Sequence, residues 1–286
     1  MTTVAFIGLG IMGKPMASNL AKAGFDVVGY NLSPKTVDGV DVKESIAEAV
    51  AEADVIATMV PDSPDVEEVL TGADGVFANA RNGSLVIDFS SIRPDVSARL
   101  AAQGAEHGLR VLDAPVSGGE QGAIDAALSI MVGGAAEDFA AAEPVLEAVG
   151  KTIVHVGPAG SGQTVKAANQ LIVAGTLELV SEAIVFLEAY GVDTEAAVKV
   201  LAGGLAGSAI LQRKAPAMLA RDFTPGFRIA LHHKDMGIVT SAAREAGVVI
   251  PLGAVVSQLI AALNAQGDGG LDHSALLKLV SQLSGR

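Results

Sequence analysis

Residues 160–191 read GSGQTVKAANQLIVAGTLELVSEAIVFLEAYG, a run without proline around which the rest of the chain is organised. The pattern predicts one helix from about Gln163 to Tyr190, roughly 40 Å long at about 1.5 Å per residue. Apolar side chains fall on most faces of this helix: Val165, Leu171, Ile172, Val173, Leu177, Val180, Ile184, Val185 and Leu187. Such a helix is expected to be largely buried at the centre of the molecule.

The first turns of this helix differ from the rest. Gln163, Lys166, Asn169 and Gln170 fall at spacings of three and four residues, which places them on one polar face. Burying a lysine costs free energy unless the lysine has a partner or a role. The start of the helix is therefore a candidate functional site.

The composition predicts a soluble protein with two domains, residues 1–160 and 161–286. The chain has 286 residues, of which 50% are hydrophobic and 18% are charged, and this is enough for two ordinary cores. A net charge of −13 argues against nucleic acid or an anionic membrane as a general partner. A membrane-spanning helix is not expected, because the long apolar run is interrupted by Lys166, Asn169, Gln170, Glu178, Glu182 and Glu188.

The residue types and motifs that the sequence lacks exclude several kinds of site. The sequence has no cysteine, which excludes disulfides, thiolate catalysis and Cys-ligated zinc. The N-terminus reads directly as a strand and lacks an export signal, so a cytoplasmic location is expected. His232, His233 and His273 raise the question of a metal, but there is no HExxH motif. We therefore interpret these histidines as solvated or capping side chains and predict no metal site.

The N-terminus has the pattern of a dinucleotide-binding unit. Thr3–Ile7 predicts a strand, a helical pattern runs to Gly24, and Asp26–Tyr30 predicts a second strand. Between the first strand and the helix lies a G-x-G-x-x-G motif, in which the glycines permit a tight turn, close approach of a pyrophosphate, and close packing of helix on strand. The candidate cofactor-binding residues are Gly8, Gly10, Ile11, Met12 and Gly13.

The end of the second strand bears on the choice of cofactor. An NAD-specific fold usually places an acidic residue here to hold the ribose diol, whereas this chain has Asn31. Ser33 and Lys35 can contact a 2′-phosphate, although Leu32 stands where an arginine often clamps it. NAD and NADP both remain open, with a slight preference for NADP. A simple turn formed by Asn31 and Ser33 is an equal alternative for Ser33.

Strands and helices then alternate, which predicts an α/β domain with a parallel, doubly wound sheet and ligands at the carboxyl ends of its strands. This places Met59, Val60, Pro61 and Ser91 beside the cofactor. The expected helices are Glu44–Ala53, Asp65–Leu70, a turn near Val76, Pro94–Gly108 and Ala136–Ala148. The expected strands are Val55–Val60, Ser84–Phe89, Leu109–Leu112 and Thr152–Val156, and a further segment of the domain is expected at Ala127–Val132. The second domain is expected to be all-α, with further helices at Thr194–Leu201, Ala209–Arg221, His232–Ala246, Leu252–Ala265 and His273–Leu283.

A glycine loop follows the strand at Leu109–Leu112. Ser117, Gly118 and Gly119 stand at its end, where their backbone N–H groups can bind an anion. A loop that only turns the chain explains the same residues equally well.

Four motifs together resemble the β-hydroxyacid dehydrogenase family over essentially the whole chain. They are GLGIMGKPMASNL from Gly8, DAPVSGGEQGA from Asp113, GSGQTVKAANQ from Gly160, and HHKDM from His232. Within the family, Gly203–Pro216 and Phe223–Asp235 resemble the enzymes that act on tartronate semialdehyde more than those that act on 3-hydroxyisobutyrate.

The resemblance implies roles for individual residues. It makes Lys166 the catalytic lysine, Asn169 a residue that orients the substrate, and Lys234 a residue that reaches the cofactor or the substrate. It also makes Ser117, Gly118 and Gly119 the site of the substrate carboxylate. The chemistry is consistent, because a cation that donates a proton stabilises the oxyanion formed when hydride reduces a carbonyl.

The expected function is therefore NAD(P)H-dependent reduction of tartronate semialdehyde, a small anionic oxo acid, to glycerate. Oxidation of 3-hydroxyisobutyrate or another β-hydroxy acid is the nearest alternative. A dinucleotide-binding interaction protein without turnover and an imine reductase are further alternatives, and the presence of Lys166 disfavours both. Because the long helix is apolar on nearly all faces, a homodimer or homotetramer is expected.

Overall fold

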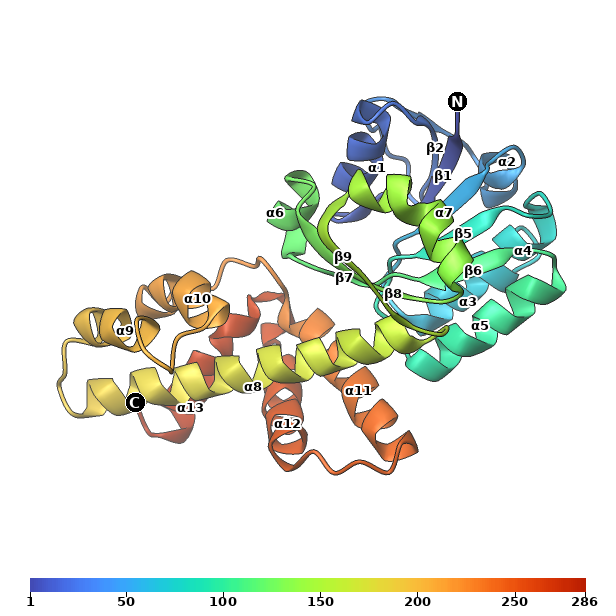
Figure 1. The fold of residues 1–286 in the computed structure, drawn as a ribbon. Helices are drawn as coiled ribbons and strands as arrows, with labels where there is room; N and C mark the ends of the chain where they lie inside the picture. The colour runs from blue at the N-terminus through green and yellow to red at the C-terminus, as the bar shows by residue number, and fades with distance from the viewer. The chain divides into compact units, whose positions relative to one another are not determined.

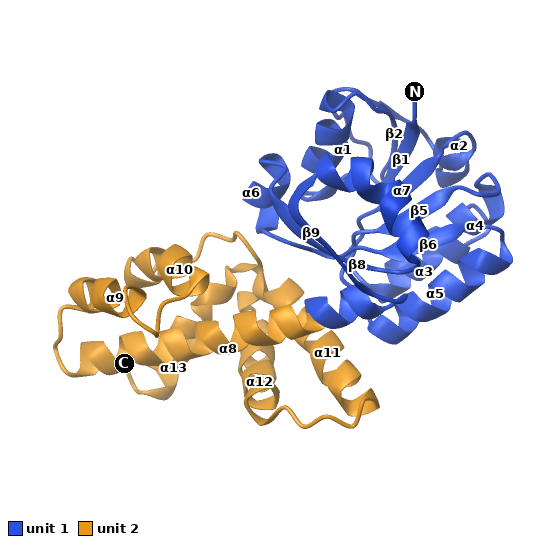
Figure 2. Ribbon diagram, viewed as in Figure 1, with its two compact units in different colours: residues 1–166 blue, residues 167–286 orange.

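Strand β1 (Thr3–Ile7) lies inside a nine-stranded sheet, in the order β3-β2-β1-β4-β5-β6-β8-β7 with β9 paired to β8. The computed structural model describes all 286 residues, and they form two compact units, residues 1–166 and 167–286 (Figure 2). The remaining strands are β2 (Asp26–Tyr30), β3 (Val40–Val42), β4 (Val55–Thr58), β5 (Leu85–Asp88), β6 (Arg110–Asp113), β7 (Val116–Ser117), β8 (Leu128–Gly133) and β9 (Gly150–Gly157).

The first six strands are parallel and follow the order of a dinucleotide-binding fold, as predicted. The predicted parallel, doubly wound sheet is confirmed for these strands, but β8 runs antiparallel to β6 and β7, which the prediction did not include. The reason is the link between β7 and β8, which is one short helix, α6 (Gly119–Ile124), and a short link returns the chain in the opposite direction. Strands β3 and β7 and helix α6 were not predicted.

Strand β8 meets β6 at the end of β6, where Asp113 pairs with Gly133. Strands β7, β8 and β9 therefore extend past the carboxyl ends of the parallel strands. Strand β9 finishes at Gly157, which pairs with Gly133, so the chain leaves the sheet beside the end of β6. This delivers the start of the long helix to the edge where ligands bind in such sheets.

Helices cover both faces of the sheet (Figure 1). One buried cluster packs α1, α6 and α7 against one face, and another packs α2 to α5 against the opposite face. These helices are α1 (Gly13–Lys22), α2 (Ile46–Val50), α3 (Ser63–Thr71), α4 (Val76–Asn79), α5 (Pro94–Glu106) and α7 (Ala136–Glu147). The predicted alternation of helix and strand is confirmed, with ends that differ by a few residues.

The second unit is helical, as predicted, and Arg228 and Asp272 form an isolated β-bridge within it. Its elements are α8 (Ser161–Ala189), α9 (Thr194–Ala202), α10 (Ala209–Leu219), α11 (Ile229–Glu245), α12 (Pro251–Ala265), the 3₁₀ turns η1 (Asp268–Gly270) and η2 (His273–Ala275), and α13 (Leu276–Leu283). A third buried cluster joins α8 to α10–α13. Helix α8 starts in the first unit and continues into the second.

Helix α8 is less buried than the sequence predicted. Ile172, Leu179 and Phe186 are 68%, 53% and 61% exposed and lie seven residues apart. Within one chain, α10–α13 pack on part of the helix circumference and leave this stripe open. By length and composition alone α8 qualifies as a membrane span, contrary to the sequence argument, but core helices of soluble proteins pass the same test.

Candidate active site

In the glycine loop after β1, each of the three glycines has different surroundings, which explain why a side chain is absent there. Gly8 has φ +98°, and a Cβ there would lie 2.3 Å from the Met59 carbonyl oxygen. A Cβ on Gly13 would lie 1.9 Å from the Gly8 carbonyl oxygen, so this position holds α1 close to the loop. A Cβ on Gly10 would meet nothing within 4 Å. The second glycine therefore faces open space, where a pyrophosphate can approach the backbone.

The start of α1 also suits an anionic ligand. Its N-cap residue, Met12, makes no side-chain hydrogen bond to the helix, and its first turn contains no acidic residue. Ile11, just before it, is exposed. The positive end of the helix dipole is thus not neutralised by the chain, and the residues fit the diphosphate of a dinucleotide.

Asn31 is attached to this loop by its side chain. Its Oδ1 accepts a hydrogen bond of 2.8 Å from the Leu9 N–H, and its Nδ2 donates to the carbonyl and hydroxyl oxygens of Ser33 at 2.8 and 3.0 Å. The turn between Asn31 and Ser33 considered from the sequence is therefore present. The same contacts hold Asn31 beside the glycine loop, which is compatible with contact to the ribose.

The other residues predicted to border the cofactor follow β4 and β5. The Met59 N–H donates to the Ile7 carbonyl at 2.9 Å, and the Val60 N–H donates to Ser90 Oγ at 3.0 Å. Pro61 is exposed and Ser91 is partly exposed. These residues share the edge of the sheet with Gly8, since β4 pairs with β1 and β5 with β4.

Lys166 lies beside the loop that contains the second glycine pair. Its Nζ donates a 2.8 Å hydrogen bond to the Val116 carbonyl oxygen, directly before Ser117. Gly118 and Gly119 have φ angles of +143° and +67° and are exposed. The structure thus brings the predicted lysine to the predicted anion-binding loop.

Asp113 and Gln163 make hydrogen bonds at the start of α8 that the sequence did not indicate. Asp113 Oδ1 accepts the Gly160 N–H at 2.7 Å, and its Oδ2 accepts the Gln163 N–H at 2.9 Å. The Gln163 side chain accepts from the Ile92 N–H at 3.0 Å and donates to the Ser90 carbonyl at 2.8 Å. Gln163 therefore does not belong to an open polar face, because it is buried and holds the helix start to the first unit.

Two buried carboxyl groups end neighbouring strands, since Asp88 of β5 and Asp113 of β6 are register partners. Burial raises the pKa of both, and hydrogen-bond donors oppose this rise at each. Asp88 Oδ1 accepts from Thr58 Oγ1 and from the Ser90 N–H, whereas Asp113 accepts from the start of α8. The two carboxyl groups are thus equally buried, but only Asp113 is hydrogen-bonded to the start of α8.

In the second unit, Asp235 connects the remaining predicted residues. Its Oδ1 lies 3.0 Å from Lys234 Nζ, and its Oδ2 accepts from Gln170 Nε2 at 2.6 Å. Gln170 Oε1 in turn accepts from Asn169 Nδ2 at 2.7 Å. The local ion pair between Lys234 and Asp235 considered from the sequence is present, and Asp235 is buried.

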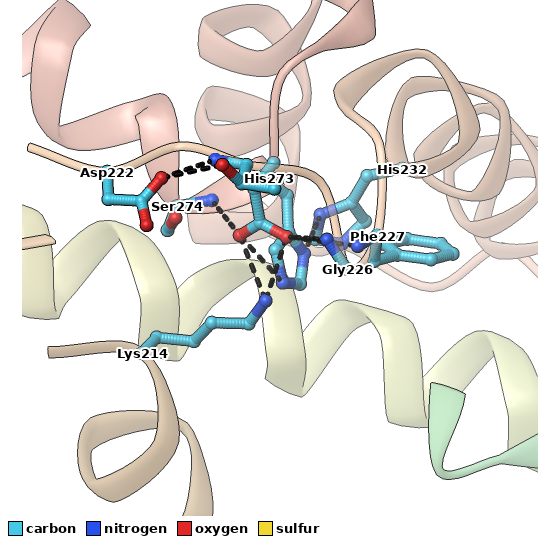
Figure 3. A network of polar contacts seen from close by, with 9 residues as sticks. Lys214, Asp222, Gly226, Phe227, His232, His273 and Ser274 are labelled. Carbon is cyan, nitrogen blue, oxygen red and sulfur yellow. Dashed lines mark hydrogen bonds and ion pairs between the residues drawn. The ribbon is translucent and has the colours of Figure 1, made fainter. Parts of the chain in front are cut away.

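Two of the three histidines belong to a buried network, shown in Figure 3. Their Nδ1 atoms, in His232 and His273, lie 3.1 Å apart, and both rings pack against Phe227. Asp272 beside them accepts two 2.9 Å hydrogen bonds from Lys214 Nζ. The prediction of solvated or capping histidines was wrong for these two, which are buried against each other, and His233 is half-buried. No group of three or more His, Asp or Glu side chains is arranged to hold a metal.

Burial and the charges in this network shift the pKa of His273 and of Asp272. Burial lowers the pKa of His273 to about 3, helped by the neighbouring His232 and opposed by Asp272. Burial alone would raise the pKa of Asp272, but Lys214 and several other donors bring it below the ordinary value. The network is one of the contacts that hold α10, α11 and η2 together in the helical unit.

Comparison with known proteins decides the family. Residues 3–157 match the NAD binding domain of 6-phosphogluconate dehydrogenase, and residues 160–280 match the NAD-binding domain of NADP-dependent 3-hydroxyisobutyrate dehydrogenase. The chain belongs to the β-hydroxyacid dehydrogenase family. It is an oxidoreductase that uses NAD or NADP, in agreement with the glycine loop and the uncapped start of α1.

Several members of this family are similar over nearly their whole length. 2-Hydroxy-3-oxopropionate reductase of Escherichia coli K12 is 42% identical, covering 98% of each chain. 3-Hydroxyisobutyrate dehydrogenase of Pseudomonas aeruginosa is 37% identical, also over 98% of each chain. Among solved structures, Mycobacterium tuberculosis 3-hydroxyisobutyrate dehydrogenase with L-serine matches with a TM-score of 0.90 at 37% identity, covering 98% of this chain and 99% of that one.

Proposed function

We propose that this β-hydroxyacid dehydrogenase reduces tartronate semialdehyde to glycerate, with Lys166 as the general acid. The observation that supports this most directly is the hydrogen bond from Lys166 Nζ to the Val116 carbonyl, because it holds an ammonium group beside Ser117, Gly118 and Gly119. The 42% identity to 2-hydroxy-3-oxopropionate reductase of E. coli supports the choice of substrate.

The proposed chemistry needs a proton and a hydride. The nicotinamide cofactor, when bound, supplies the hydride. Lys166 stabilises the developing oxyanion and donates the proton to it, and in the reverse direction Lys166 takes the proton from the hydroxyl group. Asn169, which lies one turn further along α8, orients the oxygen through its amide.

The glycine loop is the proposed site of the substrate carboxylate. A carboxylate is repelled by the net charge of −13, but screening over about 8 Å in physiological salt makes the local groups decisive. The N–H groups of Ser117, Gly118 and Gly119, together with Lys166, provide a local positive site. Lys234, which Asp235 holds in place, is proposed to contact the cofactor.

Oxidation of 3-hydroxyisobutyrate is the second candidate, favoured by the similarity to the 3-hydroxyisobutyrate dehydrogenases of P. aeruginosa and M. tuberculosis. It uses the same lysine and the same carboxylate site, so the two functions differ in substrate and not in mechanism. A panel of tartronate semialdehyde, 3-hydroxyisobutyrate and glycerate, each with NAD(H) and NADP(H), separates them by kcat/KM.

The test of the lysine role is Lys166→Met. We expect the variant to fold and to bind cofactor like the parent, while kcat falls at least about 10²-fold, the usual scale for loss of a general acid. Asn169→Ala is the matched variant one turn away, and it should lose less because it removes orientation and not the proton. Turnover by Lys166→Met at the parent rate would refute the mechanism.

We also propose that the chain is a homodimer or homotetramer in which the open stripe of α8 is covered. Leu179 and Phe186 of this stripe line a groove of about 840 Å³, which Leu283 of α13 also lines. An obligate interface of this kind buries more than about 2,000 Å². A monomer in light scattering at micromolar concentration would contradict the proposal.

A further inference from the structure

Asp113 occupies the place of a helix cap that α8 does not have in its own sequence. The residue before the helix is Gly160, which has no side chain and cannot accept the free N–H groups of the first turn. Asp113, from β6, accepts one of these, the N–H of Gln163, on Oδ2, and it accepts the N–H of Gly160 itself on Oδ1. An anion at this end of a helix is also favoured by the helix dipole.

Three glycines permit this arrangement. A Cβ on Gly162 would lie 2.3 Å from the Met131 carbonyl oxygen and 2.8 Å from Asp113 Oδ2, and a Cβ on Gly133 would lie 2.5 Å from Asp113 Oδ1. Gly160 has φ +88°, and a Cβ there would lie 2.8 Å from the Pro94 carbonyl oxygen. The start of α8 is therefore packed as closely against the end of β6 as backbone allows.

The contact between Asp113 and the start of α8 bears on the position of Lys166, because the chain after β6 and the start of α8 are joined by hydrogen bonds at two places. Asp113 holds Gln163, and three residues later on each segment Val116 accepts the hydrogen bond from Lys166 Nζ. Gln163 adds a third attachment, to Ser90 and Ile92. The backbone at the start of α8 is thus fixed against the end of β6, and from there the Lys166 side chain reaches Val116.

We infer that Asp113 is a positioning residue for the reaction, which keeps the start of α8 against the carboxyl end of β6 and so holds Lys166 at the substrate loop. This inference rests on the proposed role of Lys166. A displacement of about 1 Å in a reacting group can lower the rate about 10²-fold, so loss of this contact acts on turnover more than on binding.

The experiment compares Asp113→Asn with Asp88→Asn in the full-length protein. Asparagine keeps the size of Asp113 but turns an amide N–H toward one of its two donors, the N–H groups of Gly160 and Gln163. We expect kcat to fall about 10- to 100-fold with KM changed less than about threefold. Asp88→Asn removes an equally buried carboxyl on the neighbouring strand that makes no hydrogen bond to α8, so kcat should stay within about threefold of the parent.

A second measurement reports on Lys166 itself. Trinitrobenzenesulfonate modifies accessible amines, and the rate at the peptide that contains Lys166 can be followed by mass spectrometry. That rate should rise in Asp113→Asn and remain at the parent value in Asp88→Asn. If Asp113→Asn does not fold, Gln163→Met, which loses the contacts to Ser90 and Ile92, should show the same two changes to a smaller extent.

The outcomes are distinct. Parent kcat in Asp113→Asn, or an equal loss of kcat in Asp88→Asn, would overturn the positioning role and leave Asp113 as a stability residue. If Asp113→Asn does not fold, an unchanged kcat in Gln163→Met would overturn it too. Parent turnover in Lys166→Met would instead refute the proposed function, and the positioning role with it.

Discussion

Glu178 gives the protein an unusual dependence of stability on pH. The side chain lines the groove on α8, is only 4% exposed, and has one carboxyl oxygen, Oε2, that is buried without a hydrogen-bond partner. Burial, with a smaller contribution from Glu182, raises the pKa of Glu178 from 4.5 to about 7. Because the folded pKa is the higher one, the associated stability is complete below pH 4.5 and is lost as the pH rises through about 7.

Replacing this group by Glu178→Gln should remove that loss. The pKa difference between the unfolded and folded states corresponds to about 3.4 kcal/mol, of which about 2.5 kcal/mol falls between about pH 5 and about pH 8.5. The variant should therefore be more stable than the parent at alkaline pH by roughly this amount, relative to their difference at acid pH.

The assay is urea unfolding followed by circular dichroism, since the chain has no tryptophan. Measurements at micromolar concentration and after about 20-fold dilution separate unfolding from dissociation of an oligomer. Glu182→Gln is the control, because Glu182 is exposed and one turn away, and it should change the stability by less than about 0.5 kcal/mol. A pH dependence that is the same in Glu178→Gln and in the parent would refute the reasoning.

Three further changes test other parts of the structure. Asn31→Asp should move the ratio of kcat/KM toward NADH by repelling the 2′-phosphate, and an unmoved ratio would show that Asn31 does not read the ribose. Gly119→Val should raise the KM for tartronate semialdehyde without weakening cofactor binding, while Gly119→Ala, which shares the strain at φ +67°, should raise it less. Burial lowers the pKa of His273, so its stability contribution falls as the pH drops below about 6.5. His273→Gln removes this loss, so urea unfolding should show the variant gaining stability relative to the parent as the pH falls from about 7 to about 5, and a difference that stays constant over this range would contradict this.

The parts of the fold that could be predicted are those with a local cause. The strands Thr3–Ile7 and Asp26–Tyr30 were predicted with their observed ends, because glycines and polar residues mark where they stop. The reversed direction of β8 could not be predicted from alternation alone, since the glycine-rich link before it contains a short helix that the sequence did not indicate. The exposed side of α8 was missed because apolar residues indicate burial without showing whether the same chain provides the cover.

In the candidate site, too, some residues could be predicted from the sequence and others could not. Lys166 and the glycine loops have recognisable spacing, and the structure places Lys166 beside Val116. Asp113 could not be recognised, because its partners Gly160 and Gln163 lie 47 and 50 residues further along the chain. Gln163 looked like a member of an open polar face, but its partners come from the loop after β5, which helical spacing does not reveal.

The seven-residue spacing of Ile172, Leu179 and Phe186 also determines how two copies of α8 would pair. A straight α-helix drifts by about 20° every seven residues, so the stripe winds gently around the axis, and two such helices cross at about 20°. In an antiparallel pair related by a two-fold axis at Leu179, this residue meets its own counterpart, while Ile172 faces Phe186 twice. One substitution at Leu179 would therefore change both sides of the interface at the same point. A charged side chain introduced there would lie next to the same charge from the other copy.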